Sequence, residues 1–236
     1  MNWLTKFLTS SIGRKLIMSL TGLFLTLFLA VHLAGNLQLL VDDKGESFNI
    51  YAYIMTHNPI IKIISYGNYF FIVLHAFQGI LIALKNRSAK GSRYAVSTNE
   101  NASWNSKNMA LLGSLILAFI FIHMGDFWYK MHFTEQLALL NYDSFDYQVK
   151  DLYTRVTAAF SQWWLVLIYL IGLLVLSFHL KHGFQSAFQT LGLNHKKYTP
   201  FIKSFGNIFS IVVPVGFAII PIIYLGDALS WWNWFS

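Results

Sequence analysis

Five long stretches without aspartate, glutamate, lysine or arginine limit what this chain can fold into. They cover residues 16–41, 63–84, 108–125, 156–180 and 204–226. A helix needs about 20 mostly apolar residues to cross a hydrocarbon core of roughly 30 Å. Three aromatic residues, Phe127 to Tyr129, extend the third stretch to about residue 130. We therefore expect an all-α integral membrane protein, one bundle of five transmembrane helices over residues 1–236.

The composition agrees with this class. Only 11% of the residues are charged and 56% are hydrophobic, whereas soluble domains carry about 25% charged residues. The net charge of +7 lies in short segments between apolar runs, which favours a bilayer over nucleic acid as the partner. The chain has no cysteine, which excludes disulfides, thiolate-bound iron–sulfur clusters and covalently attached c-type haem.

The charges between the spans predict an orientation. With the N-terminus inside, the inner segments hold 12 of the 17 basic residues and one acid, Glu100, and the outer segments hold nine acids. This asymmetry follows the positive-inside rule, with the C-terminus outside. The inner basic residues are Lys6, Arg14, Lys15, Lys85, Arg87, Lys90, Arg93, Lys107, Lys181, Lys196, Lys197 and Lys203.

The segments outside the spans carry weaker signals. Residues 1–14 resemble a short amphipathic helix on the inner surface. Residues 126–155 are too long for a tight turn, so we expect an ordered loop or a short surface helix there. The C-terminal tryptophans would anchor the outer surface: Trp231, Trp232 and Trp234.

Four of the five spans each contain one histidine: His32, His75, His123 and His179. Ionisable residues inside a membrane are costly and usually face the bundle interior. A b-type haem takes two axial ligands, and facing helices of a bundle can supply imidazoles to it. Four histidines on four helices are the number that two haems with two histidines each would need.

Depth along the helices sorts the histidines into pairs. At 1.5 Å per residue, His32 lies roughly 24 Å and His123 roughly 22 Å from the inner end of their spans. His75 lies roughly 14 Å deep. His179 is at the inner edge of the fourth span, and would lie deeper if that helix continues to about residue 190. A glycine follows each of three histidines by three or four residues, where a flat macrocycle needs clearance: Gly35, Gly79 and Gly183.

Other interpretations of the histidines remain open. Each one alone could be a hydrogen-bonded interior residue, or together they could form a proton relay in a transporter. A relay favours acids at mid-membrane, and the stretches 16–41, 63–84, 108–125, 156–180 and 204–226 contain none. His182, one turn after His179, could be the ligand of the fourth helix instead, although we favour it as a propionate or neighbouring partner. An anchor without a cofactor leaves the four histidines unexplained.

Several strings, together with the histidine pattern, resemble the cytochrome b558 subunit of succinate dehydrogenase and fumarate reductase. They are Ile12-Gly13-Arg14-Lys15, His32-Leu33-Ala34-Gly35-Asn36, His75-Ala76-Phe77-Gln78-Gly79 and Phe178-His179-Leu180-Lys181-His182-Gly183-Phe184. The resemblance covers nearly the whole chain. It implies a multi-pass subunit of the bacterial inner membrane with two haem b groups, His75 pairing with His179 near the inner face and His32 with His123 near the outer face.

The resemblance also implies partners and substrates. An iron–sulfur subunit and a flavoprotein would dock on the inner face, complexes could pair as dimers, and the membrane quinone would be menaquinone or a relative. The chain itself would perform no dicarboxylate chemistry, and the direction of the reaction is open. The nearest alternative in chemistry is the b-type cytochrome of a hydrogenase or formate dehydrogenase.

The resemblance leads to three further site predictions. Arg14, Lys15 and Ser19, at the inner start of the first span, would face haem propionates. Ordinary positive-inside charge is the alternative explanation, and we favour it for Lys15. Members of the family place a carboxylate by the quinone in the first outer loop, and this chain has none at 55–59. His57 could handle protons there, or could be an interfacial histidine with no such role.

Overall fold

The structure is a computed structural model that describes residues 2–89 and 104–234. Five helical segments within these ranges are long and apolar enough to cross a membrane: Ser11–Leu40, Pro59–Ser88, Met109–Phe133, Trp163–Thr190 and Thr199–Ala228. This confirms the expected multi-pass, mainly helical architecture. The orientation of the termini stays a prediction, and three residues that entered the charge count lie outside the described ranges: Lys90, Arg93 and Glu100.

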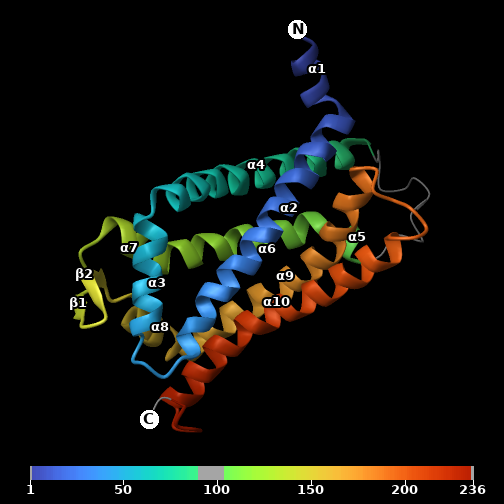
Figure 1. Ribbon diagram of the computed structural model, residues 1–236. Helices are drawn as coiled ribbons and strands as arrows, with labels where there is room; N and C mark the ends of the chain where they lie inside the picture. The colour runs from blue at the N-terminus through green and yellow to red at the C-terminus, as the bar shows by residue number, and fades with distance from the viewer. Residues whose placement is uncertain (1, 90–103, 235–236) are drawn as a thin grey trace. The chain divides into compact units, whose positions relative to one another are not determined.

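The elements follow one another along the chain as shown in Figure 1. The helices are α1 (Trp3–Thr9), α2 (Ser11–Asn36), α3 (Glu46–His57), α4 (Pro59–Ala89), α5 (Trp104–Lys107), α6 (Met109–His123), α7 (Tyr129–Phe133), α8 (Leu152–Phe160), α9 (Trp163–Thr190) and α10 (Thr199–Ala228). The 3-10 helix η1 covers Leu37–Leu40, the π-helix η2 covers Met124–Trp128, and the strands are β1 (Leu139–Tyr142) and β2 (Phe145–Lys150).

The fourth span differs from the expected one at its start. We expected it to begin at residue 156, but residues 152–160 form the separate helix α8, and α9 begins at Trp163. Asp151 caps α8 by accepting a hydrogen bond from Thr154 N at 3.0 Å. The predicted continuation of the fourth helix to about residue 190 is confirmed, and the helix ends just before Gly192, whose φ is +76°.

The chain forms two compact units. Unit 1 contains residues Met1–Phe28, Gly67–Leu115 and Val175–Ile211, and unit 2 contains Leu29–Tyr66, Ile116–Leu174 and Val212–Ser236. Large apolar side chains of the spans are exposed in both, among them Val73 at 68% in unit 1 and Phe121 at 71% in unit 2. Such exposure is typical of surfaces that face lipid.

Unit 2 contains the main buried core. Apolar side chains from α3, η2, α8, α9 and α10 pack together there, with Leu39 of η1, and Tyr224 donates a 2.7 Å hydrogen bond to the Leu39 carbonyl. Pro214 and Pro221 lie inside α10, which continues through both. The core therefore ties the end of the first span to the last span within this unit.

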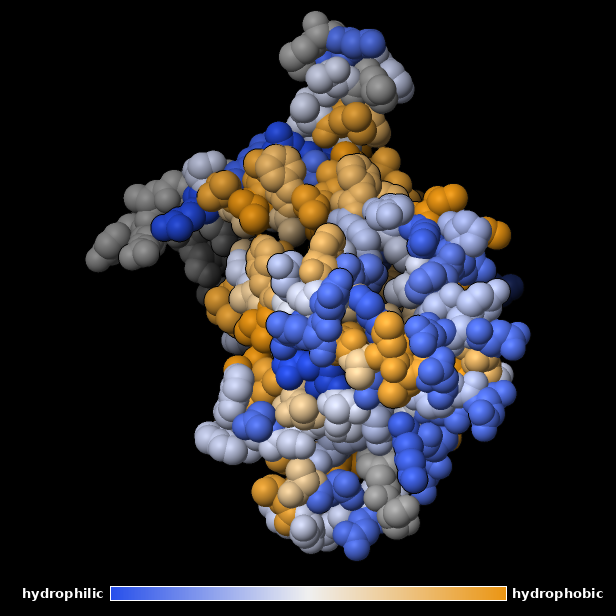
Figure 2. Space-filling view, turned by 90° about the vertical axis from the view of Figure 1, so that its left-hand side faces the viewer, coloured by the Kyte–Doolittle hydropathy of each residue, from blue (hydrophilic) through white to orange (hydrophobic). Residues whose placement is uncertain are grey.

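Unit 2 also contains an ordered surface segment built from α3, the hairpin β1–β2 and α8. The two strands pair antiparallel from Leu139↔Lys150 to Tyr142↔Phe145, an element that the sequence did not predict. Figure 2 shows the side of the molecule that carries α3 and the hairpin, where hydrophilic residues gather with smaller hydrophobic patches between them.

Asn49 of α3 holds this surface segment together. Its side chain is almost fully buried, donates to Tyr142 Oη at 3.0 Å and to Asp151 Oδ1 at 3.2 Å, and accepts from Tyr153 N at 2.9 Å. Burial raises the pKa of the Tyr142 phenol, and the hydrogen bond from Asn49 partly offsets this. One buried amide thus connects α3, the hairpin and α8.

Candidate functional site

Unit 1 brings together the rings of His75 from α4 and His179 from α9. Their ring centres lie 6.3 Å apart, with the ring planes at 69°. Thr21 of α2 contacts His75, with its Oγ1 3.0 Å from Nδ1. Gly22 lies beside the same ring, where a side-chain carbon would come within 3.2 Å of Cε1. Helix α2 therefore covers the Nδ1–Cε1 edge of His75.

His179 has a different environment from His75. Its Nδ1 is buried and has no hydrogen-bond partner among the residues the structure describes. Gly113 of α6 lies next to the ring, and a side-chain carbon there would be 3.7 Å from Cε1. His182, the alternative ligand of this helix, is half-buried, and its Nε2 lies 3.1 Å from Ser186 Oγ. The ring contact with His75 therefore favours His179 as the member of the pair.

Unit 2 brings together His32 from α2 and His123 at the end of α6. The ring centres lie 5.8 Å apart, with the ring planes at 84°. Asn36 Nδ2 lies 3.3 Å from His32 Nδ1 and donates to the His32 carbonyl at 2.8 Å. Tyr169 of α9, a buried residue, places its hydroxyl 3.2 Å from His123 Nδ1. Both histidines of this pair therefore have a polar contact at Nδ1.

Aromatic side chains surround the pair in unit 2. Phe217 lies 5.5 Å from His32 between ring centres, and Phe119 and Phe127 lie 6.1 Å and 5.6 Å from His123. Phe127 and Tyr169 also belong to the buried core. His123 therefore lies next to the buried core of unit 2.

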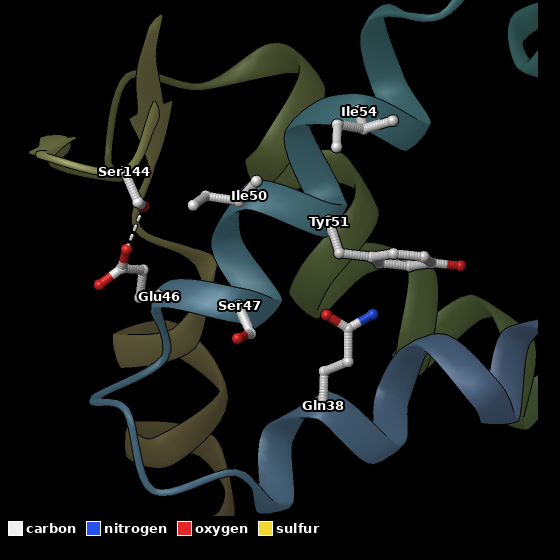
Figure 3. A pocket seen from close by; sticks show the side chains of 7 residues that line it. All are labelled: Gln38, Glu46, Ser47, Ile50, Tyr51, Ile54 and Ser144. Carbon is white, nitrogen blue, oxygen red and sulfur yellow. Dashed lines mark hydrogen bonds between the residues drawn. The ribbon is translucent and has the colours of Figure 1, made fainter. Parts of the chain in front are cut away.

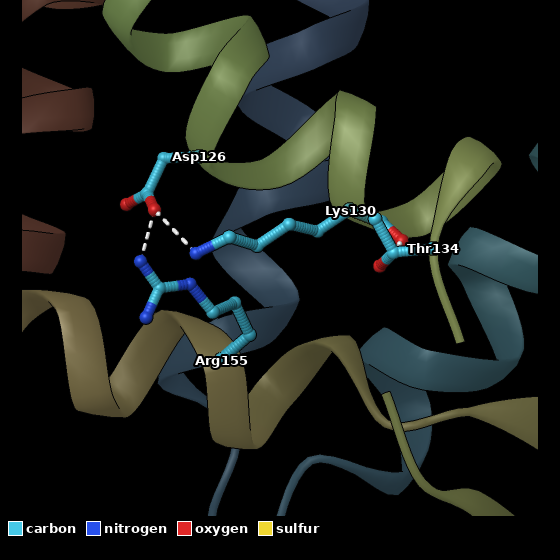
Figure 4. A network of polar contacts seen from close by, with 4 residues as sticks. All are labelled: Asp126, Lys130, Thr134 and Arg155. Atoms are coloured by element: carbon cyan, nitrogen blue, oxygen red, sulfur yellow. Dashed lines mark hydrogen bonds and ion pairs between the residues drawn. The ribbon is translucent and has the colours of Figure 1, made fainter. Parts of the chain in front are cut away.

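A cluster of three charged residues follows His123 along the chain (Figure 4). Asp126 lies in the π-helix η2 and accepts hydrogen bonds at one oxygen, Oδ1, from Lys130 at 3.1 Å and from Arg155 of α8. Its other oxygen, Oδ2, is buried without a partner in the part of the chain that the structure describes. The Asp126 carboxylate therefore links the π-helix η2 to α8.

An open pocket of about 360 Å³ lies between α3, η1 and the hairpin (Figure 3). Its walls combine polar groups with the apolar side chains of Ile50 and Ile54. Glu46, at the start of α3, accepts a hydrogen bond from the hydroxyl of Ser144 in the turn of the hairpin. Tyr51, on another wall, packs its ring against the backbone of Gly35. A side chain at position 35 would therefore collide with Tyr51, and the clearance for a macrocycle beside His32 stays a prediction.

The contacts of three predicted site residues, Arg14, Ser19 and His57, do not involve the four paired histidines. Arg14 Nε donates to the Thr9 carbonyl at 3.2 Å, and buried Ser19 donates to the Lys15 carbonyl at 2.9 Å. His57 is exposed at the end of α3, stacks on Tyr53 at 3.9 Å, and its Nδ1 lies 2.9 Å from the Tyr53 carbonyl. These contacts are all local to one stretch of chain.

The donor set limits which centres are possible. Among residues 2–89 and 104–234 there is no group of three or more histidine, cysteine, aspartate or glutamate side chains that could hold a metal ion. A bare metal ion commonly takes three or four protein ligands, whereas a haem iron takes two at most. Two facing imidazoles are the number of protein ligands that a haem iron can take.

The residues beside the histidines were not predicted from the sequence. Thr21 and Asn36 lie in the first span and Tyr169 in the fourth. The available signal was that hydroxyl and amide groups inside a span need a partner. Which partner each one takes depends on the rotation of the helices.

Comparison with known protein families, with curated proteins and with solved structures found no match to this chain.

Proposed function

We propose that this chain is the di-haem membrane anchor of a succinate:quinone oxidoreductase, with His75 and His179 as the axial ligands of one haem b and His32 and His123 as those of the other. It would pass electrons between an iron–sulfur partner subunit and a membrane quinone such as menaquinone. The separation of the histidine rings in the two pairs carries the proposal.

The separations agree with the geometry of axial ligation. With a metal–imidazole bond of about 2.0–2.1 Å and a ring nitrogen about 1.1 Å from the ring centre, two imidazoles on opposite sides of one ion have centres about 6.3 Å apart. The observed values are 6.3 Å and 5.8 Å. Ring planes can take any angle about the common axis, so 69° and 84° are both compatible.

The two nitrogen atoms of a histidine ring can serve different purposes in this proposal: Nδ1 makes a polar contact with the protein and Nε2 binds the iron. The hydroxyls of Thr21 and Tyr169 lie at Nδ1 of His75 and His123, which leaves Nε2 of these two rings for the iron. At His32 the contact at Nδ1 comes from the amide nitrogen of Asn36, which is a donor. Histidine ligands commonly use their second nitrogen in this way, and the contact orients the ring. A haem held between such imidazoles gains and loses one electron.

The partners and the orientation in this proposal come from the sequence resemblance and the charge distribution. With the N-terminus inside, the iron–sulfur subunit would dock on the basic inner face, and quinone would bind toward the outer side. The pocket beside α3 has the mixed polar and apolar walls that a quinone needs. His57 is not among its lining residues, and its role in quinone chemistry stays a hypothesis.

The direct test is the cofactor content of the purified chain or of its complex. We expect a red preparation with about two haem b per chain, quantified from the pyridine haemochrome spectrum. Edge-to-face packing of two imidazoles without iron gives similar ring separations, and that alternative predicts a folded but colourless protein. Identification of co-purified subunits by mass spectrometry would separate a succinate dehydrogenase partner from a hydrogenase or formate dehydrogenase partner.

A further inference from the structure

Two neighbouring residues of α2 fit the ring of His75 closely. Thr21 places Oγ1 3.0 Å from Nδ1, and Gly22 leaves room beside Cε1, where a side-chain carbon would come within 3.2 Å. Thr21 is only 3% exposed. A hydroxyl in this position has little access to other partners, so its hydrogen bonds can be counted.

The count fixes the direction of the bond to His75. A threonine hydroxyl has one hydrogen to donate and two lone pairs that accept. Thr21 Oγ1 lies 2.8 Å from the Ile17 carbonyl and 3.2 Å from the Met18 carbonyl, and carbonyls only accept. With the hydrogen donated to the nearer carbonyl, that of Ile17, the oxygen acts as the acceptor toward His75. The His75 ring also has a hydrogen bond to the Met18 carbonyl. Nδ1 of His75 must then carry the proton, which leaves the lone pair on Nε2.

We propose that Thr21 is a positioning residue that fixes the tautomer and orientation of His75 and makes it the stronger electron donor of its pair. The second part rests on the proposed haem function. An acceptor at Nδ1–H raises the basicity of a ligating imidazole, and a more basic ligand stabilises ferric over ferrous iron. His179 has no such acceptor among the described residues. The pair would therefore be asymmetric, and its haem would have a lower potential than without Thr21.

The test compares three variants with the wild-type complex. Thr21→Val keeps the shape and removes the hydroxyl, and Thr21→Ser keeps the hydroxyl. Thr26→Val is the matched control, because Thr26 makes the same bond to a backbone carbonyl of its own helix, Gly22 O at 2.8 Å. The measurements are haem content, a redox titration that resolves the two haems, and the low-temperature EPR signals of the ferric state.

In Thr21→Val we expect one haem to shift to higher potential with an altered EPR signal, and to be retained roughly 10- to 100-fold more weakly. Thr21→Ser and Thr26→Val should behave as the wild type does. An unchanged potential and signal in Thr21→Val would overturn the proposal, and so would an equal shift in Thr26→Val, which would make the helix bond responsible.

A second readout separates this inference from the proposed function. If the wild-type protein contains no haem, the proposed function fails, but the tautomer of His75 can still be read from its imidazole ¹⁵N shifts in detergent-solubilised protein. A single tautomer protonated at Nδ1, lost in Thr21→Val, supports the positioning role. A mixture of tautomers in the wild type overturns it.

Discussion

The two histidine pairs differ in how their rings are held. In unit 2 both histidines have a polar contact at Nδ1, from Asn36 and from Tyr169. In unit 1 only His75 has one, from Thr21, and the Nδ1 of His179 is buried without a partner in the described part of the chain. Similar ring separations therefore occur with different surroundings, and such differences in surroundings would give the two proposed haems different properties.

The largest expected effect comes from removing one ligand of each pair. Because each pair lies within one compact unit, His179→Ala and His123→Ala should each lose one haem and keep the other, giving about one haem per chain by haemochrome analysis. A redox titration of each variant would then show which potential belongs to which pair.

The control for these substitutions is His132→Ala. His132 is exposed, and its Nδ1 lies 2.9 Å from the Trp128 carbonyl. This variant should keep both haems. Loss of both haems in a folded His179→Ala protein would contradict the assignment of separate pairs.

The next effect concerns Tyr169. Tyr169→Phe removes the hydroxyl beside His123 and preserves the buried ring, so we expect the protein to stay folded with both haems. The reduction potential of the haem proposed between His32 and His123 should shift, while the reduction potential of the other haem stays constant. A net hydrogen bond contributes about 1 kcal/mol, so haem retention should fall by roughly tenfold or less. A redox titration and a heat-stability series with and without excess haem would measure both quantities.

A shift of the other haem in Tyr169→Phe would be inconsistent with this assignment. Tyr153→Phe is a suitable control, because Tyr153 also lies in unit 2 and packs against Tyr224 at 6.1 Å, away from the histidine contacts described above.

The sequence predicted the features that can be worked out from one helix at a time, without knowing how the helices pack. The five spans followed from apolar runs, and the depths of His32 and His123 along their helices fitted the pairing before any contact was known. The hairpin was missed although β2 alternates apolar and polar residues as a half-buried strand does. Residues 126–155 were assigned from their length alone, as an ordered loop or a short surface helix. Thr21 was missed because its contact with His75 joins residues 54 positions apart and depends on how two helices are rotated.

Glycine spacing was a weak guide for the same reason. Gly35 follows His32 by three residues, yet it packs against Tyr51 of α3. Gly22 and Gly113 lie beside the rings of His75 and His179, but they come from other helices than those histidines. The space around a side chain in a helix bundle depends on residues of the neighbouring helices, so it cannot be predicted from spacing along its own helix.

The smallest expected effect would make the two pairs alike. Gly113→Ser adds a hydroxyl next to His179, where a side-chain carbon would lie at an ordinary contact distance of 3.7 Å from Cε1. If Nε2 of His179 binds the iron, Nδ1 carries the proton, and a hydroxyl oxygen one bond further can accept it; Nδ1 has no partner among the described residues. We expect the haem of this pair to shift to lower potential, the opposite direction to Thr21→Val, with both haems retained. Gly113→Ala controls for the added volume and should leave the potential unchanged; an equal shift in that variant would mean that packing, and not the hydroxyl, sets the difference between the pairs.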